Sequence, residues 1–307
     1  MKVLRALISE SAIAQSNSMV MLSLRKIASR LGADDMTVAN RFRRLQEGGC
    51  MSRWQLMVNP SFFGYRILDV VVRAQPESAK VDMIRKIRLI HGVFAIQNFQ
   101  GNALKVLMLY DTEESRSRVV ELISRIANAQ KVTTSRMGLP RSETRRLTET
   151  DVTIIKALSG DARKSSVAVA RELGLSSRTV RNRVKRLRRE NTLFALPNLN
   201  LDGIPGSIPI YLSYTYTNEE SKSAVDHSII LHFDSNYLWG GFSEKEHGYV
   251  VLSAFRMADV RDFLQWAKNQ PGVAAAEVDM LTELVYLPQT FKELLSTKRL
   301  EAVYAER

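Results

Sequence analysis

The sequence predicts an α+β protein in which two winged helix-turn-helix domains alternate with two ferredoxin-like βαββαβ domains. Three observations lead to this fold class. First, the chain repeats itself at a constant offset, so that position 28 corresponds to position 170. Second, each repeat contains a helix-turn-helix pattern. Third, each such pattern is followed by short apolar strands and two helices. This offset is far longer than the roughly 20–50 residues of a solenoid repeat, so it indicates a duplicated pair of domains.

The repeat is clearest between residues 28–45 (ASRLGADDMTVANRFRRL) and 170–187 (ARELGLSSRTVRNRVKRL). Nine of these eighteen positions are identical, and no gap is needed. The repeat, together with the patterns described below, divides the chain into six segments. They are a winged helix-turn-helix domain at 1–60, a ferredoxin-like domain at 61–140, a linker at 141–147, a second winged helix-turn-helix domain at 148–203, a second ferredoxin-like domain at 204–288 and a C-terminal helix at 289–307.

The helix-turn-helix pattern is best defined in the second copy. Thr148 opens a capping box at the start of the first helix, and Ser165 or Ser166 can cap the next helix. Gly174 supplies the left-handed residue that ends this second helix, and Ser176 caps the third. Two helices joined by a short turn that contains glycine form the DNA-reading unit of helix-turn-helix proteins.

The first copy is less regular before its second helix. We expect its helices at residues 3–8, 24–31 and 34–47. The intervening stretch 9–22 (SESAIAQSNSMVML) is longer than its counterpart in the second copy. The first unit is therefore predicted to differ in shape from the second near its N-terminal end.

Apolar strands and amphipathic helices in the order βαββαβ follow each helix-turn-helix pattern, which is typical of the ferredoxin-like fold. In the first copy we expect strands at 66–74, 94–99, 104–110 and 131–137, with helices at 81–90 and 115–127. In the second copy we expect strands at 208–215, 237–242, 249–255 and 275–285, with helices at 221–231 and 260–269. Residues 139–146 and 196–206 have the composition of connectors.

Composition and charge favour a nucleic-acid partner. The 307 residues carry 44 Lys and Arg against 32 Asp and Glu, a net charge of +12, and the segment 148–193 alone carries +6. A basic excess of this kind suits a polyanion such as DNA. A single cysteine, Cys50, excludes an intrachain disulfide and a cysteine-rich zinc site, and no apolar run is long enough to span a bilayer. We expect a soluble, cytoplasmic protein.

The third helix of the second copy is the predicted DNA-reading element. On a helical wheel Val180, Val184 and Leu187 form the buried stripe, and seven basic residues lie among residues 176–190. Arginine and asparagine can bind guanine and adenine edges in two places at once, while other cations meet phosphates. The candidate DNA-binding residues of this helix are Ser177, Arg178, Thr179, Arg181, Asn182, Lys185, Arg186, Arg188 and Arg189. Arg183 and its counterpart Arg41 lie at the edge of the buried stripe, where we expect each to pair with a carboxylate.

The corresponding helix of the first copy is electrically neutral. Its outward stripe reads Met36, Asn40, Arg43 and Glu47 where the second copy has three cations and one asparagine. Each phosphate contact that is lost removes a contribution from counterion release, so we expect the second copy to dominate DNA binding. The candidate DNA-binding residues of the first copy are Asn40, Arg43 and Arg44.

Residues 147–191 resemble the Lrp/AsnC family of transcription regulators. The Leu-Gly-Leu-Ser turn at 173–176, Thr179-Val180 and the run from Arg183 to Leu187 carry this resemblance, and the βαββαβ pattern that follows is similar to the family's regulatory domain. The resemblance implies a sequence-specific transcription regulator that binds double-stranded DNA. Ordinary members pair as homodimers through their regulatory domains, so two copies in one chain imply a single-chain pseudo-dimer, which could also assemble further into homo-oligomers.

The resemblance also implies a small-molecule effector in many members, bound near a Gly-x-x-Asp loop. Gly101 and Asn102 begin the matching loop here, but Leu104 stands where the aspartate is expected. In the second copy Glu246-His247-Gly248 occupies this region, again without a suitable aspartate. Gly101 and Asn102 are therefore the candidate effector-binding residues, and a divergent effector or none fits the loop equally well.

Two other functions remain open at this point. An architectural protein that coats or bends DNA would have the same composition. Siroheme decarboxylases resemble Lrp/AsnC proteins in fold, but they need basic and histidine side chains in a pocket, and the four histidines (His91, His227, His232 and His247) are not spaced to form one. The sequence predicts no enzyme activity, no metal site and no cofactor.

Overall fold

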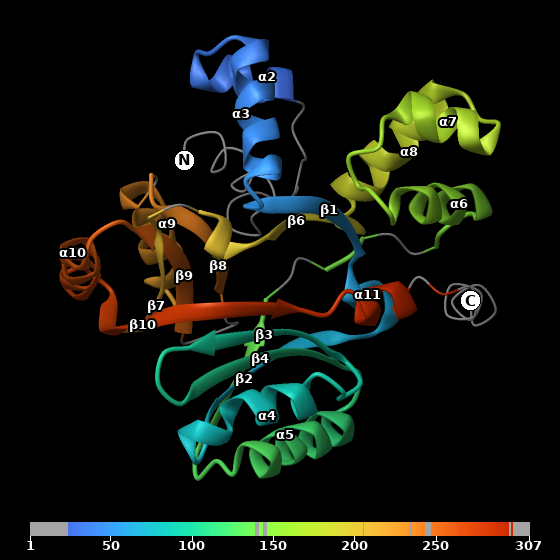
Figure 1. The fold of residues 1–307 in the computed structure, drawn as a ribbon. Coiled ribbons are helices and arrows are strands. Elements are labelled where there is room, and N and C mark those ends of the chain that lie inside the picture. Colours follow the sequence, from blue (N-terminus) through green and yellow to red (C-terminus); the bar gives the residue numbers. More distant parts are fainter. Residues whose placement is uncertain are drawn as a thin grey trace. The chain divides into compact units, whose positions relative to one another are not determined.

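The computed structural model describes residues 24–138, 141–143, 146–204, 206–233, 235–242, 247–294 and 296. The chain divides into two units, each assembled from segments that are distant in the sequence (Figure 1). Among the described residues, the sheet unit lies between positions 66 and 138 and between 204 and 290. The helical unit contains the described residues between positions 24 and 65, between 141 and 203, and from 291 onward.

The first half of the sheet unit has the order βαββαβ. Its elements are β2 (Arg66–Arg73), α4 (Lys80–Ile87), β3 (Val93–Phe99), β4 (Ala103–Tyr110), α5 (Glu113–Ala127) and β5 (Val132–Met137). A short 3-10 helix, η2 (Glu77–Ala79), leads into α4. Thr112 caps α5 by accepting a hydrogen bond from the Ser115 amide at 3.1 Å, and Asn128 ends the helix in the left-handed region.

The second half repeats this order. Its elements are β7 (Ile208–Tyr216), α9 (Lys222–His232), β8 (Tyr237–Phe242), β9 (His247–Ala254), α10 (Met257–Lys268) and β10 (Val273–Tyr286). The strands of both halves form one eight-stranded sheet in the order β5-β2-β4-β3-β10-β7-β9-β8. The halves join where β10 pairs antiparallel with β3. β10 has 14 residues, so it pairs with β7 along its first part and with β3 along its last part.

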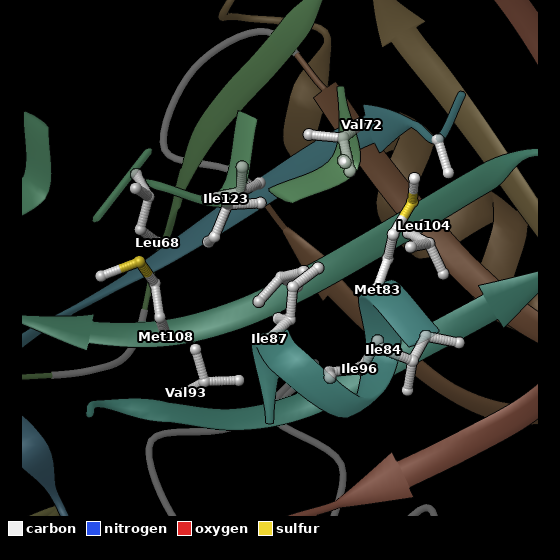
Figure 2. Packing of buried hydrophobic residues seen from close by; sticks show 14 of the residues in the cluster. Leu68, Val72, Met83, Ile84, Ile87, Val93, Ile96, Leu104, Met108 and Ile123 are labelled. Carbon is white, nitrogen blue, oxygen red and sulfur yellow. The ribbon is translucent and has the colours of Figure 1, made fainter. Parts of the chain in front are cut away.

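One hydrophobic core lies between the first half of the sheet and its two helices. Leu68 and Val72 of β2 and Leu104 and Met108 of β4 point to one face because strand side chains alternate. Helix α4 and helix α5 cover this face, and Figure 2 shows the α4 side chains among the strand residues. The residues labelled in the core are Leu68, Val72, Met83, Ile84, Ile87, Val93, Ile96, Leu104, Met108 and Ile123, and all are at most 6% exposed. β4 is buried at every position, so its other face is covered as well.

Gly92 provides a stability test of this half. Its φ is +88°, and a Cβ added here would lie 2.8 Å from the backbone oxygen of Leu109. We therefore expect Gly92→Ala to lower the free energy of unfolding in a urea titration by about 2 kcal/mol, from backbone strain together with the clash. Gly101→Ala is the matched control because Gly101 has φ +73° with nothing within 4 Å of its Cβ. Equal losses at the two glycines would show that the Leu109 contact does not contribute.

Within the part of the chain that the structure describes, each copy contributes a helix pair to the helical unit, and the second copy contributes one more helix before its pair. The first copy provides α2 (Leu24–Leu31) and α3 (Asp35–Glu47), and the second provides α6 (Glu149–Leu158), α7 (Ser166–Leu173) and α8 (Ser177–Arg189). The bounds of α7 and α8 match those of α2 and α3 under the offset of the repeat. The helix expected at residues 3–8 and the irregular stretch 9–22 lie outside the described residues.

A single strand follows each helix pair, and the two strands pair with each other. β1 (Met51–Val58) and β6 (Leu193–Leu199) form a two-stranded antiparallel sheet. Short 3-10 helices follow them, η1 (Pro60–Phe63) and η3 (Leu201–Gly203). The winged prediction needs correction here, because in the described residues neither copy forms a wing hairpin of its own. The prediction that the connector begins at residue 196 was also wrong, because β6 reaches Leu199 by pairing with a strand from the other copy.

The C-terminal helix is described only in part. α11 (Gln289–Leu294) begins where the sequence predicts it, and Phe291 and Leu294 are buried. The predicted continuation to residue 307 lies outside the described residues, apart from residue 296. None of the described helices is long and apolar enough to cross a membrane.

Candidate nucleic-acid interface

The turn between α7 and α8 is built by the capping residues that the sequence indicates. The Ser165 hydroxyl accepts a hydrogen bond from the Ala168 amide at 3.1 Å and begins α7. Gly174 ends α7 with φ +65°, a conformation that suits a residue without a side chain. The Ser176 hydroxyl then accepts a hydrogen bond from the Thr179 amide at 3.0 Å and begins α8. These contacts set the direction in which α8 leaves the turn.

Helix α8 has one buried side and one cationic side. Val180 and Leu187 are at most 1% exposed and anchor the helix in the helical unit. The cationic side carries a row of exposed polar residues, which we call the α8 row. Its members are Arg178, Arg181, Asn182, Lys185 and Arg189. The two remaining residues predicted at the start of the helix, Ser177 and Thr179, are half-buried, and the Thr179 hydroxyl lies 2.8 Å from that of Ser176.

A buried carboxylate holds the other side of α8. Asp151 of α6 is fully buried and forms ion pairs with Arg183 at 3.0 Å and with Arg186 at 2.6 Å. Burial raises the pKa of the Asp151 carboxyl, but the hydrogen bonds from Thr148 and the two guanidinium groups outweigh burial and hold the pKa below its ordinary value. The ion pair predicted for Arg183 is confirmed. Arg186, predicted to bind DNA, is placed on this structural carboxylate rather than in the α8 row.

Arg188 also departs from its predicted place among the exposed cations. It is half-buried and lines a cavity of about 400 Å³ together with Arg163, Lys164 and apolar residues of α6, α7 and α8. Burial lowers the pKa of the Arg188 guanidinium, and the positive charge of Arg163 lowers it further. A phosphate contact of Arg188 therefore stays a prediction that the geometry favours less than contacts of the α8 row.

Sequence reasoning missed Arg163, which connects the two copies within the helical unit. Its guanidinium lies 5.3 Å from the ring centre of Phe42 in α3 and 5.1 Å from that of Trp54 in β1. Beside it the Ala162 amide donates a hydrogen bond to the Trp54 carbonyl at 3.1 Å. A cation over two aromatic faces is a recognised stabilising contact. No local pattern could have identified it, because its aromatic partners belong to the other copy of the repeat.

The first copy presents a different surface. Asp34 caps α3 with its carboxylate, which accepts from the Met36 and Thr37 amides at 2.8 and 2.9 Å. Met36, which corresponds to Arg178, is 66% exposed. The Asn40 side-chain oxygen accepts from the Arg43 guanidinium at 3.4 Å, and Arg44 is exposed. Helix α3 thus offers arginine and asparagine side chains, but without the continuous cationic row of α8.

The ion pair predicted for Arg41 stays a prediction, because the first-copy segment that corresponds to α6 lies outside the described residues. Arg41 is exposed, and no described carboxylate lies within ion-pair distance of it.

The candidate effector residues lie in the turn between β3 and β4. The Gly101 carbonyl accepts a hydrogen bond from the Lys80 ammonium at 2.5 Å, and the Asn102 carbonyl accepts one from the Ala74 amide at 2.8 Å. Gly101 has φ +73°, as the hairpin interpretation expects. These contacts give both residues a structural role, and effector binding stays a prediction. Glu246 of the corresponding loop lies outside the described residues.

The histidines are dispersed. All four histidines are exposed, and His232 also stacks on Trp266 with ring centres 3.8 Å apart. Partial burial lowers the pKa of His232. Within the described residues, no three His, Cys, Asp or Glu side chains group together in a way that could hold a metal ion.

Comparison with known proteins supports the helix-turn-helix assignment and adds a match to the whole chain. Residues 147–188 match the AsnC-type helix-turn-helix domain family. A 37-residue stretch is 60% identical to the HTH-type transcriptional regulator Ptr1 of Methanocaldococcus jannaschii; this stretch covers 12% of the present chain and 25% of that protein.

Among solved structures, the siroheme decarboxylase NirDL superposes with a TM-score of 0.56 at 11% identity, covering 99% of each chain. NirDL in complex with an iron-uroporphyrin III analogue superposes with a TM-score of 0.55 at 12% identity, covering 99% of this chain and 98% of that one. At this level of identity the likeness concerns the fold alone. Residues 147–188 are therefore similar to the AsnC-type helix-turn-helix domain family, and the fold of the chain is like that of NirDL.

Proposed function

We propose that this protein is a transcription regulator that binds specific sequences of double-stranded DNA, with α8 as its main reading element. The single observation that carries the proposal is the α8 row on an AsnC-type helix-turn-helix domain. Asp151 adds support, because its ion pairs with Arg183 and Arg186 hold the opposite side of α8 and leave the α8 row facing outward. A rigid support of this kind lowers the entropy cost of placing long side chains on a partner.

The two ends of α8 have different tasks in this proposal. Arg178, Arg181 and Asn182 near the N-terminal end read base edges in the major groove, where arginine matches guanine and asparagine matches adenine. Lys185 and Arg189 bind phosphates and set the register of the helix on the duplex. The first copy adds weaker contacts through Asn40, Arg43 and Arg44 of α3. Binding is thus unequal between the two copies.

We further propose that the chain is a pseudo-dimer formed by duplication, with a helix-turn-helix domain in each copy. Three observations support this arrangement. The helices of the two copies share their lengths at the offset of the repeat, β1 of one copy pairs with β6 of the other, and β3 of one copy pairs with β10 of the other. A chain of this kind brings two reading helices to DNA without association of a second chain.

Selection from a pool of randomised duplexes, followed by fluorescence anisotropy at physiological salt, tests the proposal. We expect the selected duplex to bind at least about 10³-fold more tightly than a random duplex of equal length. An architectural protein would bind both duplexes alike. Absence of measurable binding to any duplex in dilute buffer would overturn the proposal.

Two single substitutions separate base reading from phosphate binding. Arg181→Ala is expected to relax the preference at one base pair of the selected site by about 1–3 kcal/mol. Lys185→Ala is expected to weaken selected and random duplexes by the same factor, because a phosphate contact carries no base information. Anisotropy titrations on both duplexes check this. An equal loss of preference in the two variants would contradict the division of tasks.

The fold shared with NirDL makes a tetrapyrrole enzyme the second candidate. The described residues favour it less, because all four histidines are exposed and His232 also stacks on Trp266. A visible-absorption titration with an iron-uroporphyrin III analogue distinguishes the two functions. A saturable spectral change at one equivalent would support the enzyme, and an unchanged spectrum would support the regulator.

A further inference from the structure

A buried polar cluster joins the two halves of the sheet unit. Asp69 of β2 and Lys105 of β4 form an ion pair at 2.6 Å, and both side chains are almost completely buried. The Lys105 ammonium also donates a hydrogen bond to the Tyr211 hydroxyl at 2.6 Å and lies 3.6 Å from the ring centre of Tyr249. Tyr211 and Tyr249 belong to β7 and β9 of the second half, and their rings stack 4.8 Å apart. We call these four residues the inter-half cluster.

The four residues occupy equivalent positions in the two halves. Asp69 is the fourth residue of β2, and Tyr211 is the fourth residue of the equivalent strand β7. Lys105 is the third residue of β4, and Tyr249 is the third residue of the equivalent strand β9. The strand register agrees, because Lys105 pairs with Val71 in the first half and Tyr249 pairs with the equivalent Ser213 in the second. One half therefore presents an ion pair where the other presents two tyrosines.

We infer that the inter-half cluster is a pairing code, which matches the first half of the sheet to the second half and rejects the pairing of two like halves. The inference rests on the pseudo-dimer part of the proposed function, but not on DNA binding. The partner that this surface accepts is a ferredoxin-like half bearing two tyrosines at these positions. The partner that it rejects is a second copy of itself.

The chemistry of the cluster explains the selection. An ammonium group needs several acceptors, and the tyrosine half supplies a hydroxyl oxygen and an aromatic face to complement the carboxylate. Two first halves facing each other would bury two ammonium and two carboxylate groups without these tyrosines. Two second halves would bury four phenol groups together without an ammonium group for them to contact. Burial raises the pKa of Tyr211 and Tyr249 well above the ordinary value, so neither phenol can replace the carboxylate.

The cluster is a poor device for stability alone, which favours a role in specificity. Taking a lysine and an aspartate out of water costs free energy that an ion pair only partly returns, and apolar residues of similar volume would do as well or better. The cost is increased by the second Asp69 oxygen, Oδ1, which finds no hydrogen-bond donor among the described residues. Buried polar groups that fix which partner or register is chosen are the best-attested use of such pairs.

Two full-length variants test the code by giving one half the cluster residues of the other half. The all-tyrosine chain carries Asp69→Tyr and Lys105→Tyr, and the all-ionic chain carries Tyr211→Asp and Tyr249→Lys. Alone, each chain has like residues on both halves, and we expect each to melt about 10 °C below the unaltered protein. When the two chains are co-expressed, the first half of each chain can pair with the second half of the other chain. Each such pair again joins a half with an ion pair to a half with two tyrosines. We expect a 1:1 complex of two chains by light scattering, with most of the lost melting temperature recovered.

A matched control changes an exposed ion pair of the same half. Asp82 and Lys86 pair at 2.8 Å on the surface of α4, so Asp82→Tyr with Lys86→Tyr adds the same side chains away from the cluster. We expect this chain to keep its melting temperature and to form no complex with the all-ionic chain. If either cluster variant is insoluble alone, recovery of the soluble 1:1 complex on co-expression still supports the code.

Two results would overturn the code. In the first, both cluster variants have the same melting temperature as the unaltered protein. In the second, co-expression of the two variants gives no two-chain complex. None of these readouts involves DNA, so a failure of the proposed function leaves them unaffected. Anisotropy with the selected duplex then shows separately whether the unaltered protein binds DNA.

Discussion

Asp151→Ala should lower the free energy of unfolding of the helical unit by about 3 kcal/mol, because it leaves two guanidinium groups without their buried carboxylate. Asp151 accepts hydrogen bonds from the Thr148 amide at 2.9 Å and the Thr148 hydroxyl at 2.8 Å, besides its ion pairs with Arg183 and Arg186. All these contacts disappear together. Urea unfolding followed by far-ultraviolet circular dichroism measures the loss.

Two variants define what the Asp151 carboxylate contributes. Glu149→Ala removes an exposed acid from the first turn of the same helix and should cost less than about 1 kcal/mol. Asp151→Asn keeps the volume but removes the charge, so it should lose most of the ion-pair contribution. A loss in Asp151→Ala no larger than that in Glu149→Ala would show that the carboxylate does not hold α8.

The pH dependence of the same contact has a definite sign. Because the folded protein lowers the pKa of Asp151 below its ordinary 3.8, the contribution of the carboxylate is fully present above that value. It is lost as the pH falls below 3.8 through the lower pKa of the folded state. The difference in unfolding free energy between the unaltered protein and Asp151→Asn should therefore be constant near neutral pH and shrink in the acid range. A difference that grew on acidification would contradict this assignment.

Removing the cations of the α8 row should nearly abolish DNA binding. The variant with Arg178, Arg181, Lys185 and Arg189 all changed to alanine loses the two proposed phosphate contacts, Lys185 and Arg189, and two further cations that lie near the phosphates of a random duplex. Each lost phosphate contact makes the slope of log K against log salt less steep by about 0.9, so we expect a change of roughly two units for two contacts and roughly four units for four. The affinity for a random duplex at low salt should fall by about 10³-fold or more. These side chains are exposed, so circular dichroism should report an unchanged fold.

The first copy supplies the matched control for this charge removal. The variant with Arg41, Arg43 and Arg44 changed to alanine removes three exposed cations from α3. We expect its salt slope to change by one unit or less, because α3 is neutral overall and has Met36 in place of Arg178. If Arg43→Ala weakens binding as much as Arg181→Ala does, the proposed inequality between the copies is wrong.

The elements with strong local signals were predictable from the sequence. The caps Thr148, Ser165 and Ser176 begin their helices as expected, and Gly174 ends α7 in the left-handed region. Apolar alternation likewise located the strands and helices of the sheet unit to within a few residues. The buried stripe of α8 followed from helical periodicity, and with it the exposed side that carries the α8 row.

The features that depend on distant partners were not predictable. β6 contains Pro197 and Asn198 and has the composition of a connector, yet it is a strand because β1 lies beside it. The pairing of Lys105 with Asp69 requires knowledge of the strand register, which apolar alternation alone does not provide. The inward turn of Arg188 and the aromatic contacts of Arg163 likewise depend on packing between segments that the sequence does not connect.

The length of β10 has a mechanical consequence for the sheet unit. One continuous strand is hydrogen-bonded to β7 of its own half at its beginning and to β3 of the first half at its end. The halves therefore cannot separate without breaking the backbone hydrogen bonds between β10 and β3. Local opening of either half at this seam would leave backbone amide and carbonyl groups without hydrogen-bond partners in both halves. The sheet unit should accordingly melt as a single cooperative block, with one calorimetric transition in place of two.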